Sequence, residues 1–432
     1  MNARPELSTV RAIDDCLVDG PLLDPVAARK IILGNVGEIV GDETLPLGKL
    51  LGRVASADIC SAVSLPRFDN SAVDGFGLHA ADLQRHAPLS LSIVGRAAAG
   101  HATVARLEPG KTFRILTGAR IPDGVAAVIL EERTTRSAAD VTLHFIPEMG
   151  ANIRGHGEDV SSGTMIVPKG TVLDARHLAI LAASGNARIQ VKRRLRVGVL
   201  STGDELVEPT VETGPNAIID TNRPMLLALL ASSSLELVDL GIIGDDRETI
   251  ARAVSEAASH LDLLITSGGV AGSDADHLEP AILAAGGRCK SLKLALRPGK
   301  PIARAMIGDM HVVGLPGNPV AVLVNFLLFV RPLMQRLLGA AETERAGIVA
   351  ITGETFFTNP AVQSFCRRAS HPATCRARPY CESWAAAARP GFYLWCTPTA
   401  WRSSARTQII STRARLSAFT LSALRLLFRP KP

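Results

Sequence analysis

The chain has few aromatic residues, and cysteine is scarce before its last 80 residues. Aromatic side chains make up 4% of the 432 residues, and every tyrosine and tryptophan lies at or beyond Tyr380. Cys16, Cys60 and Cys289 are scattered through the first 350 residues, which fits a reducing compartment better than a disulfide framework. The other four cysteines lack the paired short spacings of a zinc site. Composition therefore changes sharply near residue 353.

Long hydrophobic runs are also missing. No run approaches the roughly 20 apolar residues of a membrane span, and the longest, residues 320–330, is predicted to form a buried helix. The start of the chain has no signal-peptide pattern, because acidic residues and a Gly-Pro pair follow residues 1–5. We therefore expect a cytoplasmic protein without a membrane partner.

The net charge of +6 does not describe the whole chain. Twelve of the 47 basic residues but only two of the 41 acidic ones lie from Gly353 onward, so the preceding residues carry 35 basic and 39 acidic side chains. The basic character belongs to the last part of the chain. It is therefore poor support for a nucleic-acid partner, and we expect none.

From residue 193 onward, apolar strands alternate with helices. Strands are predicted at 197–200, 237–243, 263–266 and 312–315, and helices near 224–235, 246–260, 276–285 and 320–338. This order predicts a parallel α/β sheet with right-handed crossovers. Short alternating runs earlier in the chain predict β structure. The predicted fold class is α/β plus β in several domains: a mixed linking domain (1–62 and 151–192), a β-rich domain (63–150), an α/β domain (193–340) and a basic tail (341–432).

The rest of the chain is organised around the strand at 263–266 and the loop that follows it. The strand ends in Ser267-Gly268-Gly269, whose glycines allow a sharp turn and bring backbone N–H groups close to an anion. Asp274 and Asp276 come next, and carboxylates beside phosphate make sense when Mg²⁺ lies between them. The alternative is an ordinary strand-to-helix turn in which aspartates cap the helix.

Other polar loops are expected at the same edge, because the carboxyl ends of parallel strands lie together. Asp204 and Glu205 follow the first strand, Asp245 follows the second, and Pro316-Gly317-Asn318-Pro319 follows the last. The simpler role for Asp245 is to cap the next helix. Convergence of loops rich in small and acidic residues predicts a site for phosphate and a metal ion.

Two further loops carry charge between turn-forming residues. Arg297-Pro298-Gly299-Lys300-Pro301 holds two cations on a stiff backbone, which favours oxyanion binding over an idle surface. Asp69 and Asp74 lie in a loop that fits either an ordinary hairpin or a site for a charged ligand.

Taken together and in order, these motifs resemble the molybdopterin molybdenumtransferases, the MoeA and gephyrin E-domain family. The resemblance covers roughly residues 10–340 and rests on segments 68–75, 114–118, 154–159, 201–206, 220–222, 241–246, 267–276, 297–301 and 314–319. It implies a Mg²⁺-dependent enzyme that takes adenylylated molybdopterin and molybdate, releases AMP and leaves molybdenum on the dithiolene. It also implies an elongated homodimer with a C-terminal β-barrel, and a handover of substrate from the molybdopterin adenylyltransferase.

The resemblance assigns roles to particular residues. Mg²⁺ would be held at the pyrophosphate by Asp245 and Asp276, with Ser267, Gly268 and Gly269 around it. The same crevice would be lined by Glu205, Lys293 and Asn318, and the molybdate side would be formed by Arg297, Lys300 and Pro301. The β-rich region of the partner subunit would supply Asp74, Thr117 and Asp159. Catalysis itself would fall to Asp74, Asp159, Glu205, Asp276 and Lys293.

The last part of the chain departs from the family. From about residue 353 the family's last-domain pattern is missing, and the composition is typical of GC-rich coding sequence read in a wrong frame. A genuine basic extension is the alternative. We expect this tail to be unfolded in place of the β-barrel, because it carries ten net positive charges and no run of alternating strands.

Rival functions stay open beside the molybdenum-inserting transferase. The related molybdopterin adenylyltransferase shares the Ser-Gly-Gly domain but lacks the loops that contain Asp69, Asp74 and Asp159. A non-catalytic dimeric scaffold is another alternative. The clustered carboxylates argue against it, because a scaffold has no need for acidic groups whose charge is uncompensated. An enzyme impaired by the loss of its last domain is a further alternative.

Overall fold

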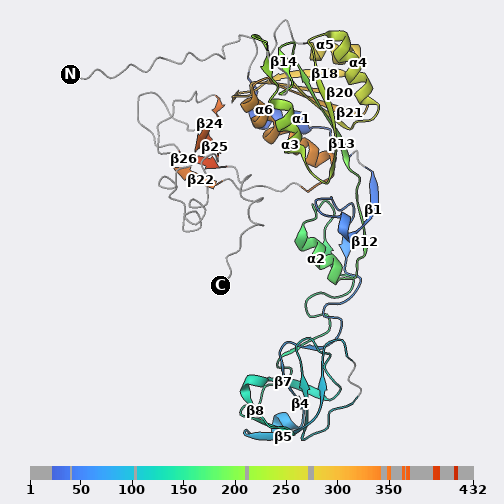
Figure 1. Cartoon of the computed structure of the whole chain (residues 1–432), viewed down its shortest axis with the longest axis vertical. Coiled ribbons are helices and arrows are strands. Elements are labelled where there is room, and N and C mark those ends of the chain that lie inside the picture. The colour runs from blue at the N-terminus through green and yellow to red at the C-terminus, as the bar shows by residue number, and fades with distance from the viewer. Residues whose placement is uncertain are drawn as a thin grey trace, which may run out of the picture. The chain divides into compact units, whose positions relative to one another are not determined.

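The computed structural model describes residues 22–38, 41–101, 105–209, 214–270 and 277–341, with short segments at 348–351, 362–364, 366–369, 393–398 and 413–416. These residues form two compact units, which Figure 1 colours by residue number. The α/β unit comprises Met1–Gly41 and Lys192–Pro432, and the β-rich unit comprises Asp42–Val191. The finer division into four domains stays a prediction.

The α/β unit is built on a six-stranded sheet in the order β16-β13-β17-β21-β20-β18. The four predicted strands are mutually parallel: β16 (Leu235–Ile243), β13 (Leu195–Thr202), β17 (Leu263–Ser267) and β21 (Met310–Leu315). The expectation of a wholly parallel sheet was wrong, however, because β20 (Pro301–Ile307) runs antiparallel to β21 and β18 (Arg288–Lys293) runs antiparallel to β20. Charged residues on β18 hide this strand from a search for apolar runs.

Helices cover both faces of this sheet (Figure 1). α4 (Arg247–Ala258) and α5 (Leu278–Ala284) pack on one face over a core that includes Val254, Leu264 and Ile282. Burying each such side chain stabilises the unit by about 1.5–3 kcal/mol. On the other face lie α1 (Pro25–Leu33), α3 (Asn222–Leu230) and α6 (Pro319–Asn325). α5 is slightly shorter than the predicted helix near 276–285, and it begins at Leu278 rather than at residue 276.

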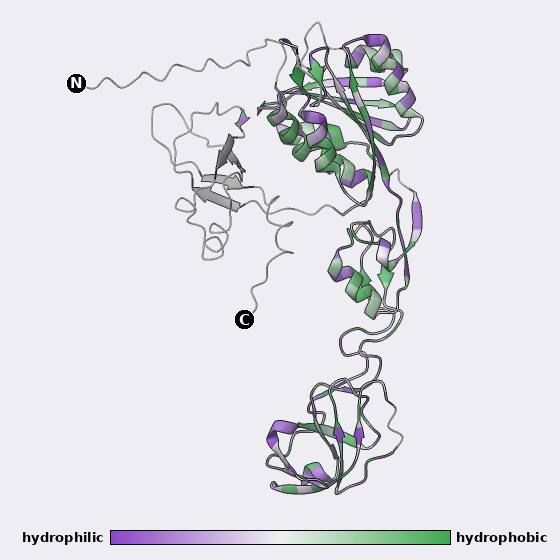
Figure 2. Ribbon diagram, in the orientation of Figure 1, coloured by the Kyte–Doolittle hydropathy of each residue, from purple (hydrophilic) through white to green (hydrophobic). Residues whose placement is uncertain are grey.

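One helix of the α/β unit is long and apolar enough to cross a membrane by length and composition alone. α6 continues through a π-helical turn, η4 (Phe326–Val330), into α7 (Arg331–Leu337), giving 19 residues with a mean hydropathy of 1.5. The helix predicted near residues 320–338 is therefore confirmed. Of its apolar window 56% is buried inside the protein, and Val322 and Leu333 are 0% exposed. Core packing thus accounts for the hydrophobic colour of α6 in Figure 2.

The β-rich unit contains a second six-stranded sheet, in the order β7-β4-β6-β5-β9-β8. Its strands are β4 (Gly75–His79), β5 (Leu89–Ala97), β6 (Lys111–Ile115), β7 (Val125–Leu130), β8 (Thr134–Arg136) and β9 (Asp140–Leu143). Burial along much of β5 alternates, which is typical of a strand with one solvated face. The β structure predicted for this region is confirmed.

A smaller core in the same unit surrounds α2 (Ala175–Ala183) and contains Leu50, Leu173 and Leu181. Two strand pairs flank it: β1 (Asp42–Pro46) with β12 (Arg188–Lys192), and β2 (Ile59–Cys60) with β11 (Met165–Val167). Asp174 caps α2 by accepting hydrogen bonds from two backbone N–H groups, at 2.9 and 3.2 Å. The Arg176 guanidinium beside it holds the pKa of Asp174 at about 2.

Short strands also occur in the described part of the tail. The strands β22 (Ile348–Ile351), β26 (Arg413–Leu416), β25 (Tyr393–Pro398) and β24 (Cys366–Ala369) form an antiparallel sheet in that order. β23 (Gln363–Ser364) pairs in parallel with β19 (Leu296–Arg297). The sequence did not predict these strands. That the tail is unfolded in place of a β-barrel stays a prediction, because most of it lies outside the described residues.

Candidate active site

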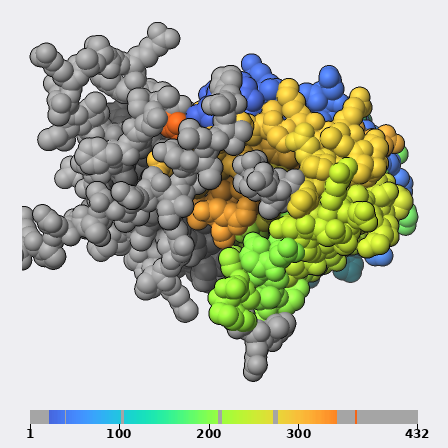
Figure 3. Space-filling model, turned by 90° about the horizontal axis from the view of Figure 1, so that it is seen from above, coloured from blue at the N-terminus to red at the C-terminus, as the bar shows by residue number. Residues whose placement is uncertain are grey.

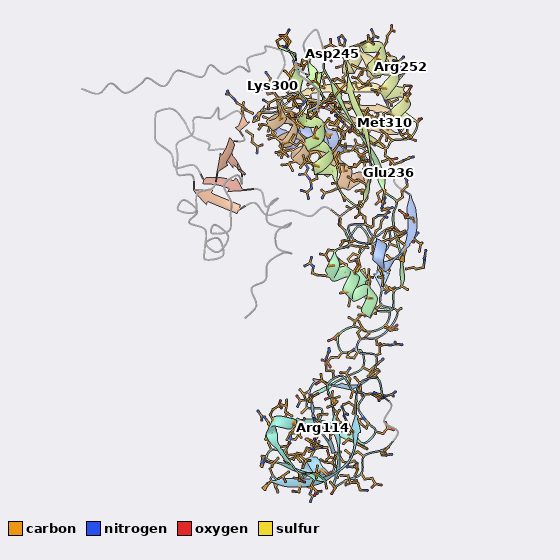
Figure 4. The ribbon with its side chains drawn as sticks, viewed as in Figure 1. Arg114, Glu236, Asp245, Arg252, Lys300 and Met310 are labelled. Atoms are coloured by element: carbon orange, nitrogen blue, oxygen red, sulfur yellow. The ribbon has the colours of Figure 1, made fainter. Side chains whose placement is uncertain are left out.

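One edge of the α/β sheet brings together most of the predicted site residues. β13, β17 and β21 end level with one another, since Ser201 lies opposite Ser267 and Ser267 lies opposite Leu315. Asp245 and Lys300 lie toward this end of the unit, whereas Glu236 and Met310 lie toward the other (Figure 4). In Figure 3 the green segment near residue 200, the yellow segment before residue 300 and the orange segment after it meet on one face.

The glycine loop begins where β17 ends at the buried Ser267. Gly268 and Gly269 have φ angles of +99° and +67°, in the left-handed region that favours glycine. A Cβ on Gly268 would lie only 2.3 Å from the carbonyl oxygen of Thr202. The Gly268 N–H donates to the Leu315 carbonyl at 3.0 Å. The loop is thus packed between its two neighbouring strands, with no room for a side chain at its first glycine.

Asn222 joins three parts of this edge, and the sequence reasoning gave it no role. Its amide nitrogen donates to the Ser267 hydroxyl at 2.8 Å and to the Gly317 carbonyl at 2.7 Å. It is the first residue of α3 and is 7% exposed. Asp220 accepts from its backbone N–H at 3.0 Å. The motif at 220–222 was the available signal, but nothing in a local pattern shows which loops such an asparagine will reach.

Acidic side chains gather beside the glycine loop. The Asp204 carboxylate accepts from the Asp245 backbone N–H at 2.9 Å. Burial raises the pKa of the Asp245 carboxyl, and the negative charges of Asp204 and Glu205 raise it further. The capping role considered for Asp245 belongs to its neighbour, because the Asp246 carboxylate accepts from the Thr249 N–H at 2.8 Å. The Asp245 carboxylate is therefore left for another purpose.

The donor chemistry of this edge fits Mg²⁺, because carboxylate oxygens are the ligands that this ion prefers. A raised pKa also indicates a carboxylate that is short of positive charge, which a bound cation would supply. Among the described residues, no group of three His, Cys, Asp or Glu side chains is placed to hold a metal ion. Asp276, the second predicted ligand, lies outside the described residues.

The basic turn, residues 297–301, leads into β20 at the same edge. Lys293 ends β18 opposite Pro301, the first residue of β20. Arg297 is exposed and Lys300 half-buried. The Leu294 N–H donates to the Lys300 carbonyl at 2.7 Å, which fixes the backbone of the turn. Two cations thus stand on a constrained backbone at the same edge of the sheet as the glycine loop.

Asn318 begins α6 at the end of the loop that follows β21. Its amide oxygen accepts from the N–H groups of Val320 and Ala321 at 2.9 and 3.3 Å. The oxygen is therefore occupied in capping the helix. The amide nitrogen is the part of Asn318 that remains for a ligand.

The β-rich unit holds the other predicted site residues. The Asp74 carboxylate accepts from both the backbone N–H and the hydroxyl of Thr117, at 2.7 and 2.8 Å. These two hydrogen bonds lower the pKa of Asp74, and the nearby Arg114 lowers it further. Asp159 accepts a hydrogen bond from the Arg154 guanidinium. Both carboxylates are exposed, and hydrogen bonds from the protein hold each in a fixed place.

A short strand pair gathers the loops that carry these carboxylates. β3 (Asn70–Ser71) pairs antiparallel with β10 (Ile153–Arg154). The Gly118 N–H donates to the Ser71 carbonyl at 2.8 Å, and the Asp69 carboxylate accepts from the His156 N–H at 2.7 Å. The segments 69–75, 117–120 and 152–159 therefore form one loop cluster within this unit.

These features define a class of protein. Its α/β domain has a glycine loop of the kind that binds phosphate, and its β-rich unit carries a separate cluster of aspartates. Residues 24–185 match the family model for the MoeA N-terminal region (domain I and II), and residues 198–336 match that for a probable molybdopterin binding domain.

Curated relatives and solved structures agree with these matches. The chain is 39% identical over 319 residues to the molybdopterin molybdenumtransferase of Haemophilus influenzae, covering 74% of this chain and 78% of that protein. It is 34% identical to that of a Nostoc species over 69% of this chain and 70% of the relative. The molybdopterin biosynthesis MoeA protein of Pyrococcus horikoshii superposes with a TM-score of 0.73 at 25% identity, covering 92% of this chain and 100% of that one. The chain belongs to the molybdopterin molybdenumtransferase family and is a transferase of molybdenum cofactor biosynthesis.

Proposed function

We propose that this chain inserts molybdate into adenylylated molybdopterin and releases AMP. The observation that carries the proposal is the single sheet edge that holds the glycine loop, Asp245 with its acidic neighbours, and the basic turn. Splitting a phosphoanhydride requires charge to be neutralised on the departing phosphate. Binding molybdate, a tetrahedral dianion, requires cationic donors in fixed positions. This edge offers groups for both tasks.

The glycine loop and its neighbours would bind the pyrophosphate. The N–H groups of Gly268 and Gly269 can approach phosphate oxygens because neither residue carries a side chain. The Ser267 hydroxyl, which already accepts from Asn222, is oriented to donate to the same group. Asp245 and Asp276 would hold Mg²⁺, which supplies the charge that the leaving phosphate needs. Glu205 and the amide nitrogen of Asn318 would line this side.

The basic turn would bind molybdate. Arg297 and Lys300 supply positive charge, and Pro301 stiffens the backbone between them and β20. Lys293, opposite Pro301, would add charge between the two anions. A guanidinium presents a planar fork of N–H donors, which suits two oxygens of one tetrahedral anion.

We further propose a homodimer in which Asp74, Thr117 and Asp159 complete the site of the partner subunit. Two hydrogen bonds from Thr117 hold the Asp74 carboxylate, and Arg154 holds that of Asp159, so both are fixed acceptors for a polar ligand. Mixing Asp74→Ala and Asp245→Ala chains, with verified subunit exchange, should restore part of the activity in hybrid dimers. Absence of recovery counts against a shared site.

The alternatives explain less of the chain. An adenylyltransferase uses the Ser-Gly-Gly domain but has no need for the loop cluster around Asp74 and Asp159. A non-catalytic scaffold leaves the raised pKa of Asp245 without a purpose. A cytoplasmic location and a handover of substrate from the adenylyltransferase complete the proposal.

The test uses the purified full chain with adenylylated molybdopterin, molybdate and Mg²⁺, and it follows AMP release and protein-bound molybdenum. Asp245→Asn should slow AMP release by about 100-fold, because a lost charge-stabilising contact costs about 3 kcal/mol. Asp246→Asn is the matched control, since its amide oxygen can still cap α4. No AMP release by the unaltered chain would overturn the function. A normal rate for Asp245→Asn in limiting Mg²⁺ would overturn the metal role.

A further inference from the structure

A second buried asparagine lies beneath the basic turn and has no role in the site described so far. Asn325 is 0% exposed and is the last residue of α6. Its amide nitrogen donates to the Pro301 carbonyl at 3.3 Å. Its amide oxygen finds no hydrogen-bond partner within the described part of the chain. An unpaired buried acceptor is costly and rare, so this arrangement requires an explanation.

The contact with Pro301 fixes which way the amide points. A carbonyl oxygen can only accept, so the nitrogen of Asn325 must face Pro301 and its oxygen must face away. That oxygen lies 3.0 Å from where a Cβ on Gly299 would be, and Gly299 has a φ of +113°. One amide therefore binds the turn at Pro301 and places its oxygen where a side chain on Gly299 would have to fit, on the other side of Lys300.

The helix geometry supports a link to the site. Asn318 and Asn325 are seven residues apart, which places them on the same face two turns from each other. The π-helical turn η4 starts directly after Asn325. Such turns are uncommon and occur frequently at functional sites. The same helix thus begins beside the Gly317 loop and reaches the basic turn with its last α-helical residue.

We propose that Asn325 is a positioning residue for the basic turn and sets its affinity for a tetrahedral oxyanion such as molybdate. The amide holds the Pro301 carbonyl, while the Leu294 N–H holds the Lys300 carbonyl at 2.7 Å. With this backbone fixed, Arg297 and Lys300 keep the spacing that a small anion needs. The inference rests on the proposed function in taking molybdate as the anion.

A purely structural asparagine has different consequences. Its loss would weaken the fold and affect both substrates alike. A positioning residue acts on the anion held by the turn and leaves the binding of adenylylated molybdopterin at the glycine loop nearly unchanged.

The test replaces Asn325 by leucine, which has similar volume and neither donor nor acceptor, in the full chain. Molybdate alone is titrated by calorimetry at constant ionic strength, and KM is measured for both substrates. We expect Kd and KM for molybdate to rise about 10-fold or more, the effect of one misplaced contact to a charged group. The KM for adenylylated molybdopterin should change less than about 3-fold.

Two further variants keep the result interpretable. Val330→Ala removes packing from a 0% exposed position on the same helix, and it should lower thermal stability without a selective effect on molybdate. Gly299→Ala leaves Asn325 intact but pushes a methyl group toward its amide oxygen, and it should reproduce the selective loss even if Asn325→Leu does not fold.

The outcomes separate this inference from the function it rests on. If the unaltered chain binds molybdate but releases no AMP, the proposed function fails and calorimetry still decides the role of Asn325. Unchanged molybdate binding in both Asn325→Leu and Gly299→Ala overturns the inference. An equal rise in both KM values overturns it too, as does absence of molybdate binding by the unaltered chain.

Discussion

Replacing Asn222 by alanine should loosen the glycine loop more than any other single change in its surroundings. The side chain is 7% exposed and donates to two different loops, at 2.8 Å to the Ser267 hydroxyl and at 2.7 Å to the Gly317 carbonyl. Alanine removes both hydrogen bonds. It also leaves the hydroxyl of the buried Ser267 without this donor, which costs more than replacing both partners would, whereas water can reach the carbonyl of the exposed Gly317.

The size of the effect follows from the two bonds. A typical intramolecular hydrogen bond contributes about 1–1.5 kcal/mol, so the local opening free energy should fall by about 2–3 kcal/mol. That corresponds to amide exchange that is faster by roughly 30- to 150-fold wherever exchange proceeds through this local opening. Activity should fall as well, because Ser267 loses the donor that orients it.

Hydrogen–deuterium exchange with mass spectrometry measures this directly in peptides that cover residues 263–270 and 314–318. The matched control is Asn186→Ala in the β-rich unit, because its amide also donates to one serine hydroxyl and one backbone carbonyl, at 2.9 and 3.2 Å. Asn186→Ala should leave both peptides unchanged. If Asn222→Ala also leaves their exchange unchanged, the idea that Asn222 joins the two loops is refuted.

Three further changes test the electrostatics and the backbone of the two units. Asp204→Asn keeps an oxygen that can accept from the Asp245 N–H but removes a negative charge. The pKa of Asp245 should therefore fall toward its usual value, and half-maximal activity should require more Mg²⁺. An unchanged Mg²⁺ requirement across a pH series would contradict this. The pKa of Asp74 lies below 3.8 in the folded chain, so its stabilising contribution is present above pH 3.8 and is lost as the pH falls through the folded value. Thr117→Val removes one of its two hydrogen bonds and should raise that pKa in a carbon-13 NMR titration, where an unmoved titration would count against the assignment. Gly268→Ala brings a Cβ to 2.3 Å from the Thr202 carbonyl and should cost at least about 1–3 kcal/mol in thermal unfolding. Gly286→Ala, which also has a positive φ but nothing within 4 Å, should cost less; equal losses would show that strain alone is responsible.

The sequence predicted the sheet edge better than it predicted the contacts within it. Apolar runs that end in glycine or acidic residues locate β13, β17 and β21, because a strand buried on both faces has little freedom in composition. β18 escaped detection, since Arg288, Lys290 and Lys293 on an outer strand look like a charged turn. The sequence also could not show which of the adjacent residues Asp245 and Asp246 caps the next helix. The structure shows that Asp246 caps α4.

The two buried asparagines show why the remaining contacts could not be predicted. Asn222 reaches Ser267 and Gly317, and Asn325 reaches Pro301, so each contact spans at least 24 residues of sequence. A local pattern carries no information about such partners. Only the register of β17, β21 and β20 places those backbone groups within reach.

The basic turn is also where the tail meets the rest of the chain. β23 pairs with β19 immediately before the turn, with Ser364 in register with Arg297, and the Gln363 N–H donates to the Ala295 carbonyl at 2.9 Å. The change of composition near residue 353 therefore comes before these pairing residues and not after them. Backbone pairing depends little on side-chain identity, so a segment of altered sequence can still form it. The turn is thus held by Leu294 beside it, by Asn325 beneath it, and at its β19 side by residues 363 and 364 of the tail.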